Sequence, residues 1–152
     1  MTRVIVTGGS GKVGRACVKD LLEHGYDVVN VDIVAPSSDQ GCPFVQVDLA
    51  DFGETLQAIA GVDDRHPGGD AIVHLAAIPA PGRSTNSVIF ENNMLSTYNV
   101  FESARILGIK NVVWASSETV LGLPFDVPPP YAPVDEDYPG RPESAYSLSK
   151  LL

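Results

Sequence analysis

Short runs of β-branched and other apolar residues alternate along this chain with longer stretches whose apolar positions follow a helical period. Five runs are nearly continuous in apolar residues, as parallel strands buried on both faces are: 3–7, 27–32, 44–49, 71–76 and 111–116. Helical spacing covers 12–24, about 51–60 and 86–107, and a further helix begins near residue 144. The alternation predicts an α/β fold built from βαβ units around a parallel sheet.

One segment departs from this alternation. Residues 122–143 contain seven prolines, a density that excludes regular structure. A loop of this length inside a compact domain is either a functional lid or a linker, and the pattern alone does not separate the two.

The composition fits one soluble globular domain. The chain has 152 residues, of which 44% are hydrophobic and 19% charged. No apolar run is long enough to span a membrane, and the net charge of −9 argues against nucleic acid or an anionic membrane surface as a partner. Cys17 and Cys42 are expected to be free buried thiols of a cytoplasmic protein, because a first strand starting at Arg3 leaves no room for a signal peptide. No metal site is predicted.

The first predicted strand runs directly into a glycine-rich turn. In "TGGSGKVG", Gly8, Gly11 and Gly14 are spaced G-x-x-G-x-x-G, and Gly9 gives the same stretch a G-x-G-x-x-G reading. Such a turn lets the backbone approach a pyrophosphate, whose charge then lies at the amide end of the following helix. A phosphate-binding P-loop would need a different spacing and a Ser or Thr after Lys12.

Asp32 ends the second strand, where a carboxylate can accept hydrogen bonds from the ribose of an adenosine. The alternative is a solvated carboxylate at a strand end. A 2′-phosphate would be repelled by Asp32, and neither Ile33 nor Val34 supplies a cation, so NAD is favoured over NADP. Lys12 argues the other way, because it could reach a phosphate.

Small or polar residues follow the other strands at the same predicted sheet edge. Ala76 and Ala77 leave room for a ligand there. Asp48 is either an adenine contact or a helix cap beside Asp51, and His74 is interpreted as a packed strand histidine rather than a base.

Tyr146 and Lys150 in "YSLSK" are four residues apart and share one face of a helix. A lysine cation favours the tyrosinate form of a neighbouring phenol, which can then exchange a proton with a carbinol or carbonyl oxygen. Taken alone, the spacing also suits an ordinary surface pair.

In this order, "TGGSGKVG", Asp32, "HLAA", "NNMLST", "SSETVLG" and "YSLSK" resemble the extended short-chain dehydrogenase/reductases, also called the NAD-dependent epimerase/dehydratase family. The resemblance implies a Rossmann-type doubly wound parallel sheet over 1–152, truncated after the fifth strand and the start of the Tyr-x-x-x-Lys helix. It also implies a catalytic set of Ser117, Tyr146 and Lys150, with Lys150 on the nicotinamide ribose. Adjacent Ser116 competes with Ser117, because only one of two neighbouring strand residues faces a site.

The resemblance places further cofactor contacts on residues spread along the chain. Beside the three loop glycines they are Lys12, Val13, Asp32, Asp48, Leu49, Leu75, Ala76, Ala77 and Asn93. Departures from the family pattern are Leu121 in place of a tyrosine, Ser96-Thr97 in place of Gly-Thr, and Glu118-Thr119 in place of Asp-Glu. A dehydratase needs both an acid and a base for the loss of water. Because Glu118-Thr119 stands in place of Asp-Glu, the dehydratase branch of the family is less favoured.

The resembling proteins are about twice as long, and their later half supplies most substrate contacts. We therefore expect the chain to be a fragment or to be completed by another chain, with its fifth strand at a sheet edge. The function expected is NAD-dependent hydride transfer to or from a carbinol of a sugar or sugar-like small molecule, in a homodimer. The alternatives are a sugar-nucleotide epimerase with tightly held NAD and a catalytically silent NAD(P)-binding module.

Overall fold

The computed structural model describes residues 1–61 and 66–152 of the chain. These residues form two compact units, which are described separately: Met1–Ala77 with Leu95–Trp114, and Ile78–Met94 with Ala115–Leu152. The elements in chain order are β1 (Arg3–Thr7), α1 (Lys12–Glu23), β2 (Asp27–Asp32), β3 (Phe44–Gln46), α2 (Phe52–Ala60), β4 (Ala71–His74), α3 (Asn86–Leu107), β5 (Asn111–Trp114), the 3₁₀ turn η1 (Glu118–Leu121) and α4 (Ala145–Leu151).

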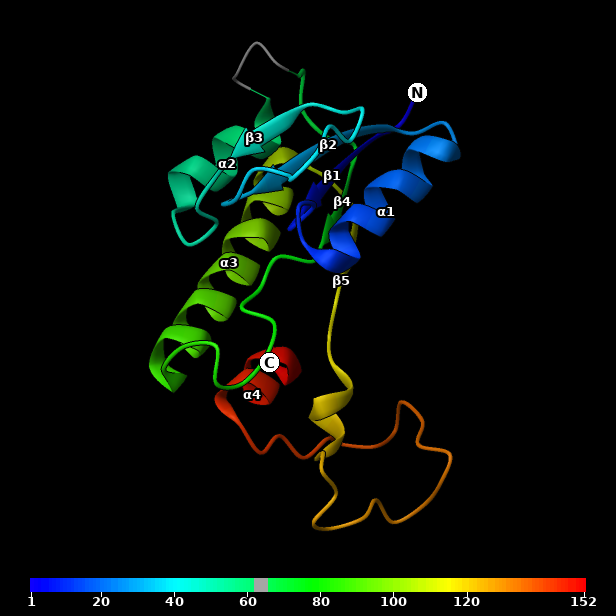
Figure 1. The fold of residues 1–152 in the computed structure, drawn as a ribbon, viewed down its shortest axis with the longest axis vertical. Helices are drawn as coiled ribbons and strands as arrows, with labels where there is room; N and C mark the ends of the chain where they lie inside the picture. The colour runs from blue at the N-terminus through cyan, green and yellow to red at the C-terminus, as the bar shows by residue number, and fades with distance from the viewer. Residues whose placement is uncertain (62–65) are drawn as a thin grey trace. The chain divides into compact units, whose positions relative to one another are not determined.

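The first unit is built on a five-stranded sheet. Its strands lie in the order β3-β2-β1-β4-β5, and every neighbouring pair is parallel (Figure 1). The chain moves from β1 outward to β3 and then returns to β4 on the other side of β1, so the direction of winding reverses between β1 and β4. In open α/β sheets a ligand binds at such a reversal, outside the carboxyl ends of the strands. The predicted α/β class with a doubly wound parallel sheet is confirmed.

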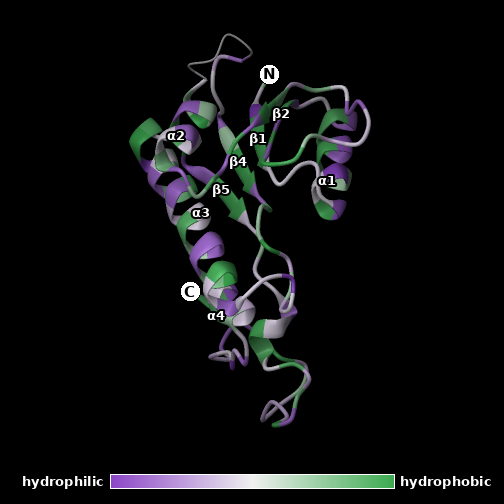
Figure 2. Ribbon diagram, turned by 60° about the vertical axis from the view of Figure 1, so that its left-hand side comes forward, coloured by the Kyte–Doolittle hydropathy of each residue, from purple (hydrophilic) through white to green (hydrophobic). Residues whose placement is uncertain are grey.

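Helices pack on both faces of this sheet. α1 covers one face, where Val18 packs with Val4, Val6 and Val28. α2 and the second half of α3 cover the other face, over a larger core. That core contains Ile5, Val29, Val31, Val45, Val47, Leu49, Ala58, Ile59, Ile72, Val100 and Ala104. The middle of β1 is hydrophobic in Figure 2, whereas α1 alternates between hydrophobic and hydrophilic positions, as a helix with one buried side does.

Three strands are shorter than the apolar runs that predicted them. β3 ends at Gln46 rather than at residue 49, because its partner β2 ends at Asp32, which pairs with Gln46. The amide of Val47 makes the last bond to the carbonyl of Asp32, at 3.0 Å. β4 and β5 likewise end at His74 and Trp114, two residues before the predicted ends. The apolar run thus continues beyond the point where a partner strand is present.

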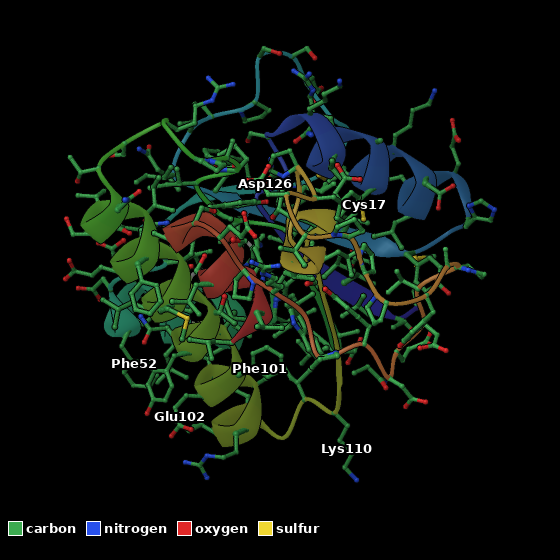
Figure 3. The ribbon with its side chains drawn as sticks, turned by 90° about the horizontal axis from the view of Figure 1, so that it is seen from below. Cys17, Phe52, Phe101, Glu102, Lys110 and Asp126 are labelled. Carbon is green, nitrogen blue, oxygen red and sulfur yellow. The ribbon has the colours of Figure 1, made fainter. Side chains whose placement is uncertain are left out.

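β5 lies at the edge of the sheet, as predicted. Val113 and Trp114 are exposed there. The Trp114 ring packs edge-on against Phe101 of α3, with 5.1 Å between ring centres, and Figure 3 shows Phe101 beside Glu102 on that helix. The tryptophan therefore covers the last turns of α3 rather than a strand.

The two thiols do not form a disulfide. Cys17 and Cys42 are free and half-buried, which is less burial than the sequence predicted. Both lie beside the core under α1. Burial raises the pKa of each thiol.

The second unit contains η1, α4 and the proline-rich segment. As predicted, 122–143 form neither helix nor strand. The later end of the segment bonds back to η1: the amide of Arg141 donates to the carbonyl of Val120 at 2.7 Å, and the Tyr138 hydroxyl donates to the carbonyl of Leu121 at 3.2 Å. In the part of the chain that the structure describes, no helix is long and apolar enough to cross a membrane.

Candidate functional site

The glycine loop of the first unit turns sharply at Gly8. This residue has a φ of 71°, a conformation that favours glycine. Its amide donates to the carbonyl of Val31 at 2.8 Å. A Cβ at Gly8 would lie 2.7 Å from the backbone nitrogen of Ala76, so the segment after β4 packs directly against the loop. The loop and the residues after β4 are therefore neighbours at the point where the winding reverses.

The loop leads into α1 through exposed residues, and the amide of Gly11 donates to the carbonyl of Gly8 at 3.1 Å. Gly11 is the N-cap residue, and it has no side chain that could cap the first amides of the helix. Gly14 packs so closely on the loop that a Cβ would come within 2.0 Å of the carbonyl oxygen of Gly8. Gly11 itself is exposed, has a φ of −71°, and a Cβ there would come no closer than 3.2 Å to another atom of the chain. Because Gly11 has no side chain, the outer side of the loop stays open next to Lys12 and Val13, which are also exposed.

Asp32 is held against this loop at the end of β2. One carboxylate oxygen accepts a hydrogen bond from the amide of Ser10 at 3.0 Å, and the other accepts from the amide of Val34 at 3.1 Å. The carboxylate is thus fixed in orientation beside the start of α1. Sequence reasoning found Asp32 but not Ser10, whose amide fixes it.

Asp48 and Leu49 follow β3 with opposite environments. Asp48 is exposed, and its carboxylate accepts from the amide of Ala50 at 2.9 Å. The Leu49 side chain is buried in the core, and its carbonyl accepts from Asn99 at 2.9 Å. The cap of α2 is Asp51, which accepts from the amide of Glu54 at 2.9 Å, so the capping alternative for Asp48 does not hold.

The residues after β4 divide between the core and the loop. Leu75 packs beside the core under α1, and Ala76 lies against Gly8 as described. Ala77 is half-buried. His74 is buried and its two ring nitrogens lie 2.7 Å from the Thr7 hydroxyl and 3.1 Å from the Thr97 hydroxyl. The interpretation of His74 as a packed strand histidine is therefore confirmed.

In the second unit, α4 carries Tyr146 and Lys150 on one face, one helical turn apart. The helix starts with a capping box in which Ser144 and Ser147 bond each other's backbone amides, at 3.0 and 2.9 Å. Tyr146 is buried. The two serines, three residues apart at the start of the helix, are the sequence signal of this box.

Lys150 is bound to the segment that follows β5. Its ammonium donates to the carbonyl of Ala115 at 2.9 Å, and the Ser116 hydroxyl donates back to the carbonyl of Lys150 at 3.0 Å. Burial lowers the pKa of the Lys150 ammonium. These two bonds hold the lysine and its helix end against 115–116.

Ser117 begins the η1 turn. Its hydroxyl oxygen accepts from the amide of Thr119 at 3.2 Å and lies 2.9 Å from the Thr119 hydroxyl. The Ser116 hydroxyl instead bonds the end of α4. The two neighbouring serines thus have separate partners, as the alternation along an extended chain predicts.

Asn93 links three segments of the second unit. Its carbonyl oxygen accepts from the amide of Ile78 at 2.8 Å, and its amide group donates to the carbonyl of Ile78 at 3.3 Å and to the Ser149 hydroxyl at 3.1 Å. Ser149 in turn donates to the carbonyl of Tyr146 at 2.7 Å. The side chain predicted to contact a cofactor therefore also ties α4 to the 78 segment.

The predicted site residues fall into two groups. The first unit brings together the glycine loop, Asp32 and the residues after β4, and it also holds Asp48 and Leu49 beyond β3. The second unit brings together Asn93, Ser117, Tyr146 and Lys150 around α4. The contacts described above join the glycine loop to Asp32 and Ala76 in the first group, and Asn93 to α4 in the second. Asp48 and Ser117 instead bond residues close to them in sequence, Ala50 and Thr119.

Comparison with known proteins identifies the family. A family model described as "NAD dependent epimerase/dehydratase family" matches residues 4–152. The chain belongs to this family. A UDP-glucose 4-epimerase of Yersinia pestis is 33% identical over 162 residues, which cover 98% of this chain and 45% of that protein. A crystal structure of a Thermus thermophilus UDP-glucose 4-epimerase in complex with NAD is 31% identical with a TM-score of 0.82, and covers 99% of this chain and 48% of that one. A structure described as a mutated uronate dehydrogenase is 34% identical with a TM-score of 0.79, at 98% and 50% coverage.

The chain spans about half the length of the curated members of the epimerase/dehydratase family that it matches. Within that half, the first unit fits the cofactor for which the family is described. The start of α1, which has no side-chain cap, suits a pyrophosphate, and the space beside Gly11 lets it approach the backbone. Asp32 offers a fixed carboxylate for a ribose diol.

Proposed function

We propose that this chain is the NAD-binding part of an NAD-dependent oxidoreductase that acts on a carbinol of a sugar or sugar-like small molecule. The observation that carries the proposal is the uncapped start of α1, which follows β1 at the reversal of the sheet with Asp32 fixed beside it. All of 1–152 is assigned to the NAD-binding domain. The homodimer and the cytoplasmic location expected from the sequence stay predictions.

The geometry of Asp32 favours NAD over NADP. Both carboxylate oxygens are held by amides of the chain, at Ser10 and Val34, so the charge cannot turn away from a bound ribose. A 2′-phosphate at that ribose would meet a fixed negative charge without a neighbouring cation from Ile33 or Val34.

The residues around α4 are assigned the proton chemistry. The Tyr146 phenolate takes the proton of the substrate hydroxyl, and Ser117 donates a hydrogen bond to the same oxygen. Lys150 supports the phenolate through its charge and positions the nicotinamide ribose. NAD would supply the acceptor for the hydride that leaves the carbinol carbon. A lysine alone would be protonated at neutral pH and could not take this proton, which is why the tyrosine has the proton-transfer role.

The names of the relatives support two forms of this activity. The uronate dehydrogenase structure is consistent with net oxidation of a sugar, in which NADH leaves the enzyme. The UDP-glucose 4-epimerases are consistent with a second candidate, an epimerase that returns the hydride to the same substrate. The two differ in whether NADH accumulates during turnover.

The proposal is tested by binding and by turnover with a Tyr146→Phe variant. NAD affinity is measured by calorimetry, and NADH absorbance is followed with a panel of sugars, uronates and nucleotide sugars. Tyr146→Phe removes only the hydroxyl, so it should keep NAD affinity within about twofold and lower turnover by roughly 10²- to 10⁴-fold. Tyr26→Phe, the same change at an exposed turn before β2, is the matched control and should leave both unchanged.

The outcomes separate the possibilities. Accumulation of NADH supports the dehydrogenase, and product formation without NADH supports the epimerase. In the full-length protein, NAD binding without turnover of any substrate would favour a silent binding module. No NAD binding by the wild-type chain, or full turnover by Tyr146→Phe, would contradict the proposed function.

A further inference from the structure

An amide side chain is buried in the middle of β2 beneath the glycine loop. Asn30 is fully buried, whereas Val28, Val29 and Val31 around it are apolar. Its carbonyl oxygen has no hydrogen-bond partner in the described part of the chain. A buried amide with an unpaired oxygen is costly where a valine would pack without loss. The bonds that its NH₂ group makes therefore need an explanation.

Both hydrogens of that NH₂ group go to the segments around the predicted cofactor site. Asn30 donates to the Ser10 hydroxyl at 3.1 Å and to the side-chain oxygen of Gln40 at 2.6 Å. Gln40 then donates its own amide to the carbonyl of Gly9 at 2.8 Å. The chain of bonds joins the strand, the 33–43 segment and the glycine loop.

This arrangement leaves little freedom to the peptide between Gly9 and Ser10. The Gly9 carbonyl is held by Gln40 on one side of the peptide, and the Ser10 amide donates to Asp32 on the other. A Cβ at Gly9 would come within 2.3 Å of the Asn30 side-chain oxygen, so the loop lies directly on the Asn30 amide. Since a peptide is planar, fixing its carbonyl also fixes the direction of its N–H.

We infer that Gln40, oriented by Asn30, is a positioning residue that sets the glycine loop against Asp32 and so determines the affinity for the adenosine half of NAD. The inference rests on the proposed function. Positions 28, 30 and 32 lie on one face of β2, which packs under α1 at Val28, supports the loop at Asn30 and ends at Asp32. Gln40 brings the 33–43 segment onto the same face.

The chemistry requires a primary amide at position 40. The residue must accept from Asn30 and donate to Gly9 at the same time, which glutamine does and which methionine and glutamate do not. Gln40→Met keeps the size of the side chain and removes both bonds. Gln46→Met is the matched control, because Gln46 donates to the carbonyl of Ile33 in the same segment at 3.2 Å and is exposed.

The test compares ligands that represent the two halves of NAD. Calorimetry with NAD, ADP-ribose and nicotinamide mononucleotide is carried out on the wild-type chain and on the two methionine variants. Gln40→Met should weaken NAD and ADP-ribose about tenfold, the effect of losing one to two net hydrogen bonds, and leave nicotinamide mononucleotide unchanged. Gln46→Met should bind all three ligands as the wild type does. Thermal melting shows whether both variants are folded to the same extent.

A second pair of variants tests the same network from the loop side. Ser10→Thr keeps a hydroxyl that accepts from Asn30, and Ser10→Ala does not. ADP-ribose affinity should be retained in Ser10→Thr and lowered several-fold in Ser10→Ala. Equal ADP-ribose affinity in Gln40→Met and the wild type, or equal weakening of both halves, would overturn the inference. Failure of the wild-type chain itself to bind NAD would overturn the proposed function and this inference with it.

Discussion

Asn93 offers a direct measure of what holds α4 in place. Asn93→Leu keeps a side chain of similar size and removes three hydrogen bonds that leave α3. Two of these bonds join the backbone of Ile78 and the third joins the Ser149 hydroxyl. Asn93 is buried, so water does not replace the lost partners.

The expected magnitude follows from these contacts. A neutral hydrogen bond contributes about 1 kcal/mol net, so the three bonds together stabilise the second unit by about 3 kcal/mol. Because each 1.4 kcal/mol is a factor of ten, the amide of Ile78 should exchange with solvent about a hundredfold faster in Asn93→Leu. In Asn93→Leu the Ile78 amide also loses its acceptor, which further increases its rate of exchange with solvent.

Hydrogen exchange followed by NMR at Ile78 and along α4 measures this change. Asn92→Leu is the control: its side chain donates to Asn93 at 3.2 Å and holds neither Ile78 nor Ser149 in the described part of the chain, so the change should cost less than about 1 kcal/mol. In a double-mutant cycle, Asn93→Leu and Ser149→Ala should show a coupling of about 1 kcal/mol. Exchange at Ile78 that is no faster in Asn93→Leu than in Asn92→Leu would refute the reasoning.

Two further changes report on other contacts. Burial lowers the pKa of Lys150 below its ordinary 10.5, so between that lowered pKa and 10.5 the unfolded chain binds more protons than the folded one. Urea titrations at increasing pH through this window measure the free energy of unfolding of the wild type and of Lys150→Met. The wild-type value should rise relative to that of the variant. A difference between the two proteins that does not change with pH would contradict the burial of Lys150. Asp51→Ala should lower the free energy of unfolding by about 1 kcal/mol, because Asp51 caps α2. Exposed Gln57→Ala in the same helix is its control, and an equal effect of the two changes would contradict the capping role.

The order of the elements could be predicted because it depends on local patterns. Apolar runs, the helix start near Asp51 and the glycine turn before α1 are each visible within a few residues of sequence. The ends of β3, β4 and β5 could not be predicted this way, because a strand ends where its partner ends. Val47 and Leu49 continue the apolar alternation of β3 and are buried, yet β2 has no residue left to pair with them.

The candidate site likewise contains some residues that a local pattern predicts and others that it does not. Gly8, Gly14 and Asp32 follow from a short spacing next to a strand. The partners that hold them do not: Gln40 reaches Gly9 across 31 residues, and no periodicity connects the two positions. Asn30 also looked like one more residue of a buried strand, although it is the amide on which the glycine loop rests.

Both units use a side-chain amide to bond backbone groups of the chain that follows a strand. Where a parallel strand ends, the chain after it has amides and carbonyls that no neighbouring strand can bond, and burial makes them costly to leave unpaired. A side-chain amide offers a donor and an acceptor without a charge, so it can replace a missing backbone partner. Asn93 does this for Ile78 after β4, and Gln40, which Asn30 orients, does it for the Gly9 carbonyl in the loop after β1. The 78 segment and the glycine loop are thus both held by side-chain amides, while the start of α1 has no side-chain cap from Gly11.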